Sequence, residues 1–422
     1  MYRPAMSLST SPPTGAVVVR AGTTTSGEFA TITEALNSFP DSTSSRSLFI
    51  YPGTYTEQVD ITRTGPLTIY GYTTDTTTYT SNSATITFNS PASTAGSDDA
   101  SGTLRIHKDN FSMYNVNVKN TFGPGVQAIA LSQYGSQVGF YGCGFYGYQD
   151  TLYANEGTQV YLKGYIEGGI DFIFGREGSA YFGGNTIGVL AEGGSITASG
   201  RETDDSGSYV FHQNTVVLGT GAPSTVAGTY YFGRPWSDFA KVIFESTTLD
   251  VAPNPALWSL WDGEADSIDN VLNADYNTTG PGASNLERAS WATELTSASE
   301  AAEYSISSAV GSDWEDWVDS ALLPKYTVNS TMTGSNIEVS PSAGNPTQIS
   351  RLCRRLTAKD RIITLSTTAR CHVVPRSEIV IAFGALELRI WPTKEFGELI
   401  CSLPNYMPLS ACSGYTGTRS TT

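Results

Sequence analysis

Apolar and polar residues alternate along this chain in many short runs, and helical periods are rare. One helical period occurs near the N-terminus, where we predict a single amphipathic helix over residues 26–40. One face of that helix would carry Phe29, Ile32, Ala35 and Leu36. From residue 47 to residue 249 the chain consists of short runs of β-forming residues, each bounded by Gly, Asn, Asp, Ser or Pro, which is typical of short strands. The pattern therefore predicts an all-β fold with a short N-terminal helix.

The runs recur at a nearly constant spacing. Aligning the segments GFYGYQD, YIEGGID and NTIGVLA places Phe145, Ile166 and Ile187 in register, with a step of 21 residues each time. A unit of about twenty residues cannot bury its apolar side alone, so it must stack on its neighbours. This spacing predicts a parallel β-helix. A β-sandwich is the alternative, but a sandwich does not favour a constant offset of this length.

The same spacing relates several polar residues. Asp150 and Asp171 are also 21 residues apart, and Gln127 precedes Gln149 by 22, so we expect these four residues to occupy equivalent positions on three successive coils. Because neighbouring strands lie about 4.8 Å apart, the two carboxylates would be roughly 5 Å apart. Such a pair splits its two pKa values and can supply an acid together with a base or a nucleophile. The alternative is a pair of solvated aspartates that the repeat merely stacks.

The segment YYFGRPWSDFAKVIFE offers a cation and an aromatic platform. Arg234 could hold one of the aspartates ionised through its bidentate fork, with Trp236 beside it. Alternatively, Arg234 closes a surface salt bridge next to a structural Trp. Trp258 and Trp261 could stack on sugar rings or cover an edge of the helix, and composition favours neither reading.

Charge is spread unevenly over the 422 residues, whose formal net charge is -16. Residues 332–422 hold ten Lys or Arg and six Asp or Glu, a net of +4, which leaves -20 for residues 1–331. An acidic body argues against nucleic acid and anionic membranes as partners. No stretch of 18 apolar residues occurs, so we expect no membrane span.

The cysteines divide in the same way as the charge. Cys143 stands alone in the body, so the body is expected to fold without an internal disulfide. The other four could pair in three ways or stay reduced. These four are Cys353, Cys371, Cys401 and Cys412.

Several other kinds of site are excluded. The run GCGFYG matches a dinucleotide-binding pattern but lies in a strand-like segment with no helix after it. No G-x-S-x-G motif occurs, which argues against a serine esterase of the α/β-hydrolase type. His107, His212 and His372 share no ligand spacing, so we expect no zinc site. Because the paired carboxylates can themselves supply an acid and a nucleophile, we also expect no metal or organic cofactor.

Four motifs resemble a known family when taken together. GVQAIAL, GYQDTLY, GGIDFIFG and GRPW, in this order and with these gaps, resemble the pectin methylesterases of the pectinesterase family, and the lone body cysteine and acidic balance are similar to its fungal members. The resemblance runs from about Pro13 to about Tyr326. It implies a right-handed parallel β-helix catalytic domain over residues 13–326, with an unassigned segment over residues 1–12 and an unmatched Cys-containing tail over residues 327–422.

The resemblance also implies catalytic roles. Asp171 would be the nucleophile that attacks the methyl-ester carbonyl of a galacturonate unit, and Asp150 would protonate the departing methanol and then activate water. Gln149 and Gln127 would donate hydrogen bonds to the oxyanion. Arg234 would position Asp171 and keep it ionised.

The resemblance further implies a sugar-binding groove and a location. Trp236 and Trp258 would line the groove, and Tyr148 and Tyr153 would shape it. The partner would be methyl-esterified pectin, bound by a monomer. The family is secreted, whereas the opening residues MYRPAMSLST lack the apolar run of a secretory signal.

Two other functions fit the residues. Carboxylates about 5 Å apart also suit a retaining glycosidase, here one that acts on polygalacturonate. The other hypothesis is a catalytically silent β-helix that binds polysaccharide. Methanol release, new reducing ends and chain retention on methylated pectin distinguish the three.

Overall fold

The computed structural model describes residues 9–40, 42–261 and 268–324, together with the backbone of three short strands between residues 372 and 390. The chain divides into two compact units, residues 1–325 and residues 326–422. In the second unit, β28 (His372–Val373), β29 (Ile379–Phe383) and β30 (Leu386–Ile390) pair in antiparallel order. The tail's four cysteines and most of residues 327–422 lie outside the described residues.

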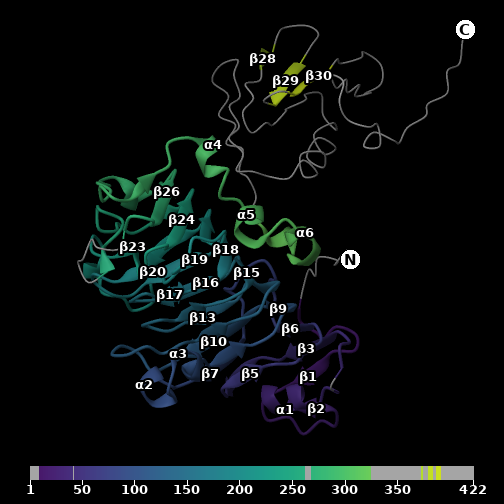
Figure 1. Ribbon diagram of the computed structural model, residues 1–422. Helices are drawn as coiled ribbons and strands as arrows, with labels where there is room; N and C mark the ends of the chain where they lie inside the picture. Colours follow the sequence, from purple (N-terminus) through teal and green to yellow (C-terminus); the bar gives the residue numbers. More distant parts are fainter. Residues whose placement is uncertain are drawn as a thin grey trace, which may run out of the picture. The chain divides into compact units, whose positions relative to one another are not determined.

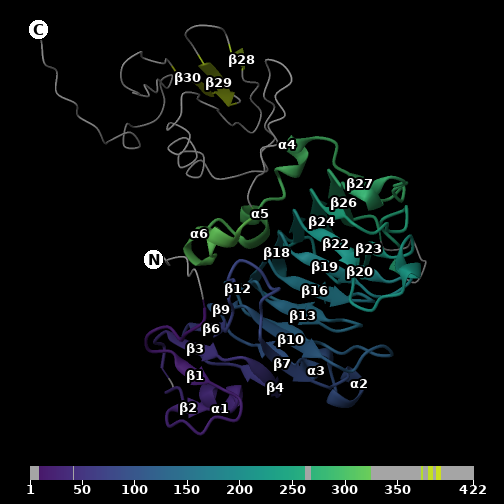
Figure 2. The same ribbon diagram turned by 180° about the vertical axis from the view of Figure 1, so that it is seen from behind.

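The first unit is built from three parallel sheets (Figures 1 and 2). The longest sheet contains β2 (Glu28–Phe29), β1 (Val17–Val19), β3 (Arg46–Ile50), β6 (Leu67–Gly71), β9 (Phe111–Tyr114), β12 (Val138–Tyr141), β15 (Thr158–Leu162), β18 (Ser179–Gly183), β21 (Tyr209–His212), β24 (Lys241–Glu245), β26 (Leu272–Tyr276) and β27 (Thr293–Glu294). The second contains β4 (Gly53–Thr56), β7 (Ala84–Phe88), β10 (Val116–Asn120), β13 (Gly144–Tyr146), β16 (Tyr165–Gly168), β19 (Thr186–Val189), β22 (Thr215–Leu218) and β25 (Thr248–Leu249). The third, which we call the site sheet, contains β5 (Val59–Ile61), β8 (Leu104–Ile106), β11 (Leu131–Gln133), β14 (Leu152–Ala154), β17 (Ile173–Gly175), β20 (Ser195–Ser199) and β23 (Tyr231–Pro235).

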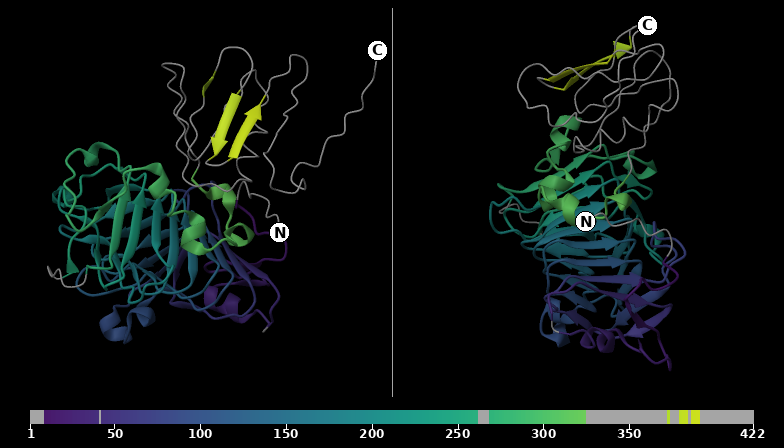
Figure 3. Two further views of the ribbon diagram at one scale, coloured as in Figure 1. Left: turned by 45° about the horizontal axis from the view of Figure 1, so that its top comes forward. Right: turned by 90° about the vertical axis from the view of Figure 1, so that its right-hand side faces the viewer.

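Strands are taken from the three sheets in turn, so each circuit of the chain adds one strand to each sheet. The predicted register is confirmed, because Phe145 pairs with Ile166 and Ile166 pairs with Ile187. Every ladder between named strands of the first unit is parallel, which rules out the antiparallel β-sandwich. Figure 3 shows the stacked strands from two further sides. The all-β parallel β-helix expected from the spacing is therefore the observed fold.

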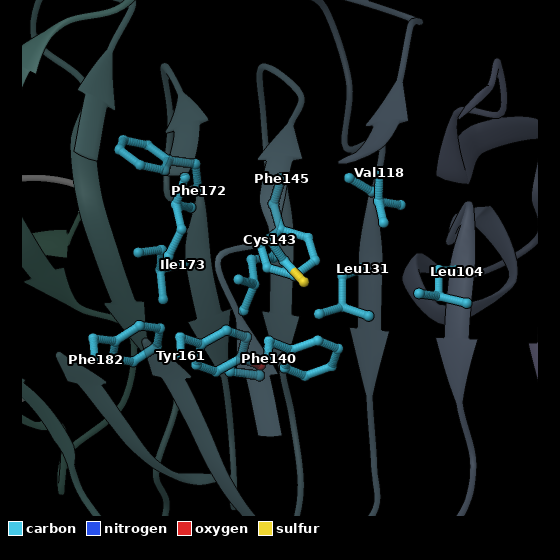
Figure 4. Close-up of a cluster of buried hydrophobic side chains, with 14 of the residues drawn as sticks. Leu104, Val118, Leu131, Phe140, Cys143, Phe145, Tyr161, Phe172, Ile173 and Phe182 are labelled. Carbon is cyan, nitrogen blue, oxygen red and sulfur yellow. The ribbon is translucent and has the colours of Figure 1, made fainter. Parts of the chain in front are cut away.

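The interior holds apolar side chains stacked in rows along the helix. Phe140, Tyr161, Phe182, Phe211 and Phe244 come from equivalent positions of successive strands in the longest sheet. Their ring centroids are separated by 5.0, 4.7, 4.3 and 4.2 Å in that order. Figure 4 shows the first three of these rings among aliphatic neighbours. Offset stacking of this kind adds to the free energy gained by burying the rings, and it fixes which residue lies above which.

The N-terminal helix is shorter than predicted. α1 spans Ile32–Asn37, with Thr31 as its N-cap accepting a hydrogen bond from the backbone N–H of Glu34. The preceding residues form β2, because their backbone groups pair with β1 instead of a helical turn. Ile32 and Ala35 are buried, as the apolar face required. Phe29 lies in β2 and not on the helix, and Leu36 is half-buried, so the predicted face is confirmed only for Ile32 and Ala35.

Other short helices lie between the strands or follow the last coil. α2 (Ala92–Ala95) and α3 (Asp98–Ser101) lie between β7 and β8 in the chain. α4 (Ala298–Ala301), α5 (Ile306–Val310) and α6 (Trp314–Trp317) follow the last coil, and α5 packs on β15 and β18. Within the described residues, 3-10 turns form at η1 (Ser224–Val226), η3 (Pro281–Ala283) and η4 (Ser320–Leu322). The α2–α3 segment carries an acidic residue, Asp98, whose charge acts on Asp150.

Candidate active site

Asp150 and Asp171 occupy the same corner of two neighbouring coils. Each lies two residues before a strand of the site sheet, β14 for Asp150 and β17 for Asp171. The backbone N–H of Asp150 donates to the carbonyl of Ile170 at 3.0 Å, and Gln149 forms an isolated parallel bridge with Ile170. The pairing places the two aspartates in the register that their 21-residue spacing predicts.

Both aspartates adopt a left-handed backbone. The φ angle is 62° at Asp150 and 48° at Asp171. Outside glycine, Asp and Asn are among the residues that tolerate this conformation best. Close packing explains why the two positions before Ile170 in the GGID motif are glycines. A Cβ atom at Gly168 would lie 2.2 Å from the Cβ of Phe172, and one at Gly169 would lie 2.8 Å from the Cβ of Ala191. The motif thus allows the corner to pack tightly around Asp171.

Arg234 forms a bidentate ion pair with Asp171. Its Nε donates to Oδ1 at 2.9 Å and its Nη2 to Oδ2 at 2.6 Å. Arg234 lies on β23, two strands from β17 across β20, so the pair spans the site sheet. The Asp171 residue is only 6% exposed. A buried carboxylate that accepts two charge-assisted hydrogen bonds is favoured in its ionised form.

Asp150 has the opposite environment. The residue is 8% exposed, and no Arg or Lys pairs with its carboxyl among the described residues. Burial raises the pKa of Asp150 to about 9, with further increases from the charges of Asp171 and of Asp98 in α3 and a smaller decrease from Arg234. At neutral pH a carboxyl with this pKa is protonated, and Asp150 lies one coil from the carboxylate that Arg234 pairs. Paired-carboxylate chemistry requires two carboxyl groups whose pKa values are pushed apart in this way.

Replacing Asp150 by Asn is expected to stabilise the fold by an amount that grows with pH. Below about pH 4 the carboxyl is protonated in both the folded and the unfolded chain, so the substitution changes little. Above that pH the unfolded chain releases the proton, while the folded chain retains it up to about pH 9, and this difference favours unfolding. Asn carries no such cost. Melting of both proteins at about pH 4, 6 and 8 should show a Tm difference that increases with pH. A constant difference would contradict the raised pKa.

Gln127 and Gln149 lie next to the acidic pair. The backbone N–H of Ala128 donates to the carbonyl of Gln149 at 3.1 Å, which places Gln127 one coil before Gln149, as their spacing predicts. Both residues are half-buried. Among the residues that the structure describes, no protein group accepts a hydrogen bond from either side-chain amide. Their N–H groups are therefore available to a ligand.

Aromatic side chains cover the outer face of the site sheet. Tyr153 stacks on Phe174 with ring centroids 4.4 Å apart, and Tyr134 meets Tyr153 edge-on at 5.8 Å. Trp236 and Trp261 stack at 6.0 Å. We call these five residues the aromatic wall. Two of them, Tyr153 and Trp236, are residues for which the sequence predicted a groove-lining role.

Tyr148 packs against the coil that carries Asp171. Its ring lies over the backbone of Gly169, where a Cβ atom would be 3.1 Å from Cζ of the ring. Tyr148 is half-buried, so part of the ring faces solvent. Tyr148 lies two residues before Asp150, and its groove-shaping role stays a prediction.

The prediction for Trp258 is wrong. Trp258 is 1% exposed and packs edge-on against Phe232 and Phe244, each at 5.9 Å. The ring belongs to the apolar core, and the backbone of Trp258 bridges Gly233, so the ring is not accessible to a sugar. Trp261 lies in the aromatic wall instead, with the guanidinium of Arg234 4.2 Å from its ring centroid.

Sequence reasoning missed two charged residues of this region. Asp98 contributes to the electrostatics of Asp150, and nothing in the sequence placed the α2–α3 segment near the site. Arg176 lies with its guanidinium 4.0 Å from the ring centroid of Trp236. A signal for Arg176 did exist, because it follows Phe174 by two residues and so continues the outward-facing alternation of β17.

Comparisons with known proteins agree with this geometry. The Pectinesterase family model matches residues 16–313. The pectinesterase of Aspergillus niger is 42% identical over 318 residues, which are 74% of this chain and 93% of the relative. The pectinesterase of Aspergillus aculeatus is 40% identical over 322 residues, which are 74% of this chain and 94% of the relative.

A solved structure is similar as well. The crystal structure of the pectin methylesterase from Aspergillus niger in deglycosylated form superimposes with a TM-score of 0.67 and 39% sequence identity. The match covers 74% of this chain and 99% of the crystallised one.

Proposed function

Because this chain belongs to the pectinesterase family, we propose that Asp171 is the nucleophile and Asp150 the proton shuttle with which it hydrolyses methyl esters. The chain is a carboxylic ester hydrolase that demethylesterifies pectin, releasing methanol and leaving free galacturonate carboxylates. The observation that carries the residue assignment is the contrast between the two aspartates. Asp171 accepts a bidentate ion pair from Arg234, whereas Asp150 is buried and its pKa is raised to about 9.

In the first half of the reaction an acyl-enzyme forms. An oxygen of the Asp171 carboxylate attacks the ester carbonyl carbon, which gives a tetrahedral oxyanion. As this collapses, the bond to the methoxy oxygen breaks, and Asp150 transfers its proton to that oxygen so that methanol departs. Asp171 is then joined to the galacturonate as a mixed anhydride, and Asp150 is left ionised.

In the second half, water releases the product. The Asp150 carboxylate now acts as a base and takes a proton from the water that attacks the galacturonate acyl carbon. The bond between that carbon and the Asp171 oxygen breaks, which restores the Asp171 carboxylate and its pair with Arg234. The galacturonic acid gives its remaining proton to solvent, and Asp150 is again protonated.

The two glutamines stabilise the oxyanion of both halves. Replacing Gln149 by Ala should lower kcat by about a hundredfold to a thousandfold with little change in KM, because the donor acts on charge that develops in the transition state. The same result is expected for Gln127→Ala. Steady-state kinetics on methylated pectin measures kcat and KM separately for each variant. A raised KM with unchanged kcat would mean that the glutamines only bind substrate.

One assay tests the function against its alternatives. The protein is incubated with highly methylated pectin while methanol, new reducing ends and retention of the polysaccharide on immobilised protein are followed. Methanol without new reducing ends is the expected result. Reducing ends would indicate a glycosidase, and retention without either product would indicate a binding protein.

The substrate and the setting of the enzyme follow from the same family. Methyl-esterified homogalacturonan is the proposed form of pectin bound. We infer that the enzyme acts outside the cell as a monomer, which sedimentation of the purified protein tests. In the part of the chain that the structure describes, no helix has the length and apolar character needed to cross a membrane.

A further inference from the structure

Arg176 lies on the same face as the catalytic pair and is not used by the mechanism. It follows β17 directly and is five residues after Asp171, so at most about 17 Å of extended chain separates the two residues. Its backbone N–H donates to Oδ1 of Asn155 at 3.2 Å, which anchors this point to the coil before. Arg176 is therefore within reach of the same polysaccharide chain that occupies Asp171.

The guanidinium of Arg176 packs against an aromatic neighbour. It lies over the ring of Trp236, 4.0 Å from the centroid. Trp236 is itself packed on the backbone of Gly200, where a Cβ atom would come within 2.4 Å of Cε3 of the ring. Trp236 follows Arg234 by two residues, so Arg176 and Trp236 lie beside the Asp171–Arg234 pair on the same two segments of chain.

A guanidinium that stacks on an aromatic ring keeps the N–H groups at its edge free for a planar anion. In the structure this edge already meets a carboxylate, because Nη1 of Arg176 donates to Oε1 of Glu202. The side chain of Glu202 is 68% exposed and that of Arg176 is 40% exposed, so their ion pair is weak and open to competition. Glu202 thus occupies the position that an external carboxylate would take.

We propose that Arg176, held against Trp236, forms a subsite for the free carboxylate of a de-esterified galacturonate unit, with Glu202 as an internal competitor for the same guanidinium. This inference rests on the proposed function, which supplies such units as product. Residues 1–331 carry a net charge of -20, which repels a polyanion, so a positioned cation of this kind favours retention of a de-esterified chain. The subsite would let the enzyme bind a chain that already carries free carboxylates next to the ester under attack.

The test is inhibition of methanol release by oligogalacturonate that carries no methyl esters. Arg176→Gln should weaken this inhibition by about tenfold, because a charge-assisted contact is lost. Glu202→Gln should strengthen it by about threefold, because the competing carboxylate is removed. On fully methylated substrate, Glu202→Gln should leave kcat unchanged, since Glu202 takes no part in the chemistry.

Arg20 provides a matched control. Its guanidinium lies 3.5 Å from the ring centroid of Tyr51, it pairs with Glu28 at 2.8 Å, and its side chain is 41% exposed. Arg20→Gln removes the same positive charge from the same kind of stack at the N-terminal end of the coils, so inhibition should not change.

Two results would overturn the subsite. One is equal inhibition of Arg176→Gln and wild type, and the other is an equal loss of inhibition in Arg20→Gln, which would reflect net charge alone. Inhibition that fails to strengthen in Glu202→Gln would overturn the competitor role. Absence of methanol release from wild type would instead contradict the proposed function, so the two failures are distinguishable.

Discussion

Replacing Asp171 by Asn should lower kcat for methanol release by on the order of 10⁵-fold, as expected when a covalent nucleophile is removed. Asn has nearly the same shape and tolerates the left-handed φ of 48° at this position, so the corner of the coil should remain intact. An amide oxygen is a far weaker nucleophile than a carboxylate. The measurement is methanol release from methylated pectin under saturating substrate.

Asp275 offers a matched control for this variant. It is fully buried and accepts a bidentate pair from Arg288 at 2.7 and 2.8 Å, away from the site sheet. Asp275→Asn therefore breaks the same kind of buried ion pair and should lower Tm while leaving kcat per folded molecule unchanged. If Asp171→Asn retained activity within tenfold of wild type, the nucleophile assignment would be wrong.

Replacing Asp150 by Asn should lower kcat by about a hundredfold to ten-thousandfold, the usual contribution of a general acid and base. The expected pH dependence is equally specific. Attack on a methyl ester requires the proton on Asp150, so kcat/KM of wild type should fall as pH rises through about 9, where free Asp150 ionises. In Asp150→Asn no group remains to lose that proton, and this alkaline decline should disappear from the residual activity.

A change of leaving group provides the control for Asp150. p-Nitrophenolate departs without protonation, so Asp150→Asn should be acylated by a p-nitrophenyl ester far more readily than by a methyl ester. An equal loss on both esters, or an alkaline decline near pH 9 that persists in the variant, would show that Asp150 is not the proton donor.

The stacking of the coils could be predicted from sequence because one circuit adds one strand to each sheet. A constant step of 21 residues then fixes which residues become neighbours, as for Phe145 with Ile166. The same step is enough to place Asp150 beside Asp171. The helix over residues 26–40 was predicted too long because the backbone of Glu28 and Phe29 pairs with β1 and forms a strand.

The direction of a side chain could be predicted only inside regular strands. Trp258 lies in an irregular segment between β25 and β26, where Leu257 adopts a left-handed φ of 59° and breaks the alternation that distinguishes inward from outward positions. Asp98 could not be placed because the α2–α3 segment is an insertion between strands and has no counterpart in the repeat. Its approach to Asp150 depends on tertiary contacts alone, such as the hydrogen bond from the backbone N–H of Ala92 to the carbonyl of Gln127 at 2.8 Å.

The most direct test of the assigned roles is to trap the acyl-enzyme. Asp150→Asn is mixed with the p-nitrophenyl ester of a galacturonate oligomer, quenched in acid and digested, and the peptides are mapped by mass spectrometry. Acylation should proceed while hydrolysis stalls for want of a base, so one galacturonoyl group should accumulate on Asp171 and be absent from the Asp150→Asn, Asp171→Asn double variant. An adduct on another residue, or turnover of the ester with no adduct at all, would contradict the assignment of Asp171 as nucleophile.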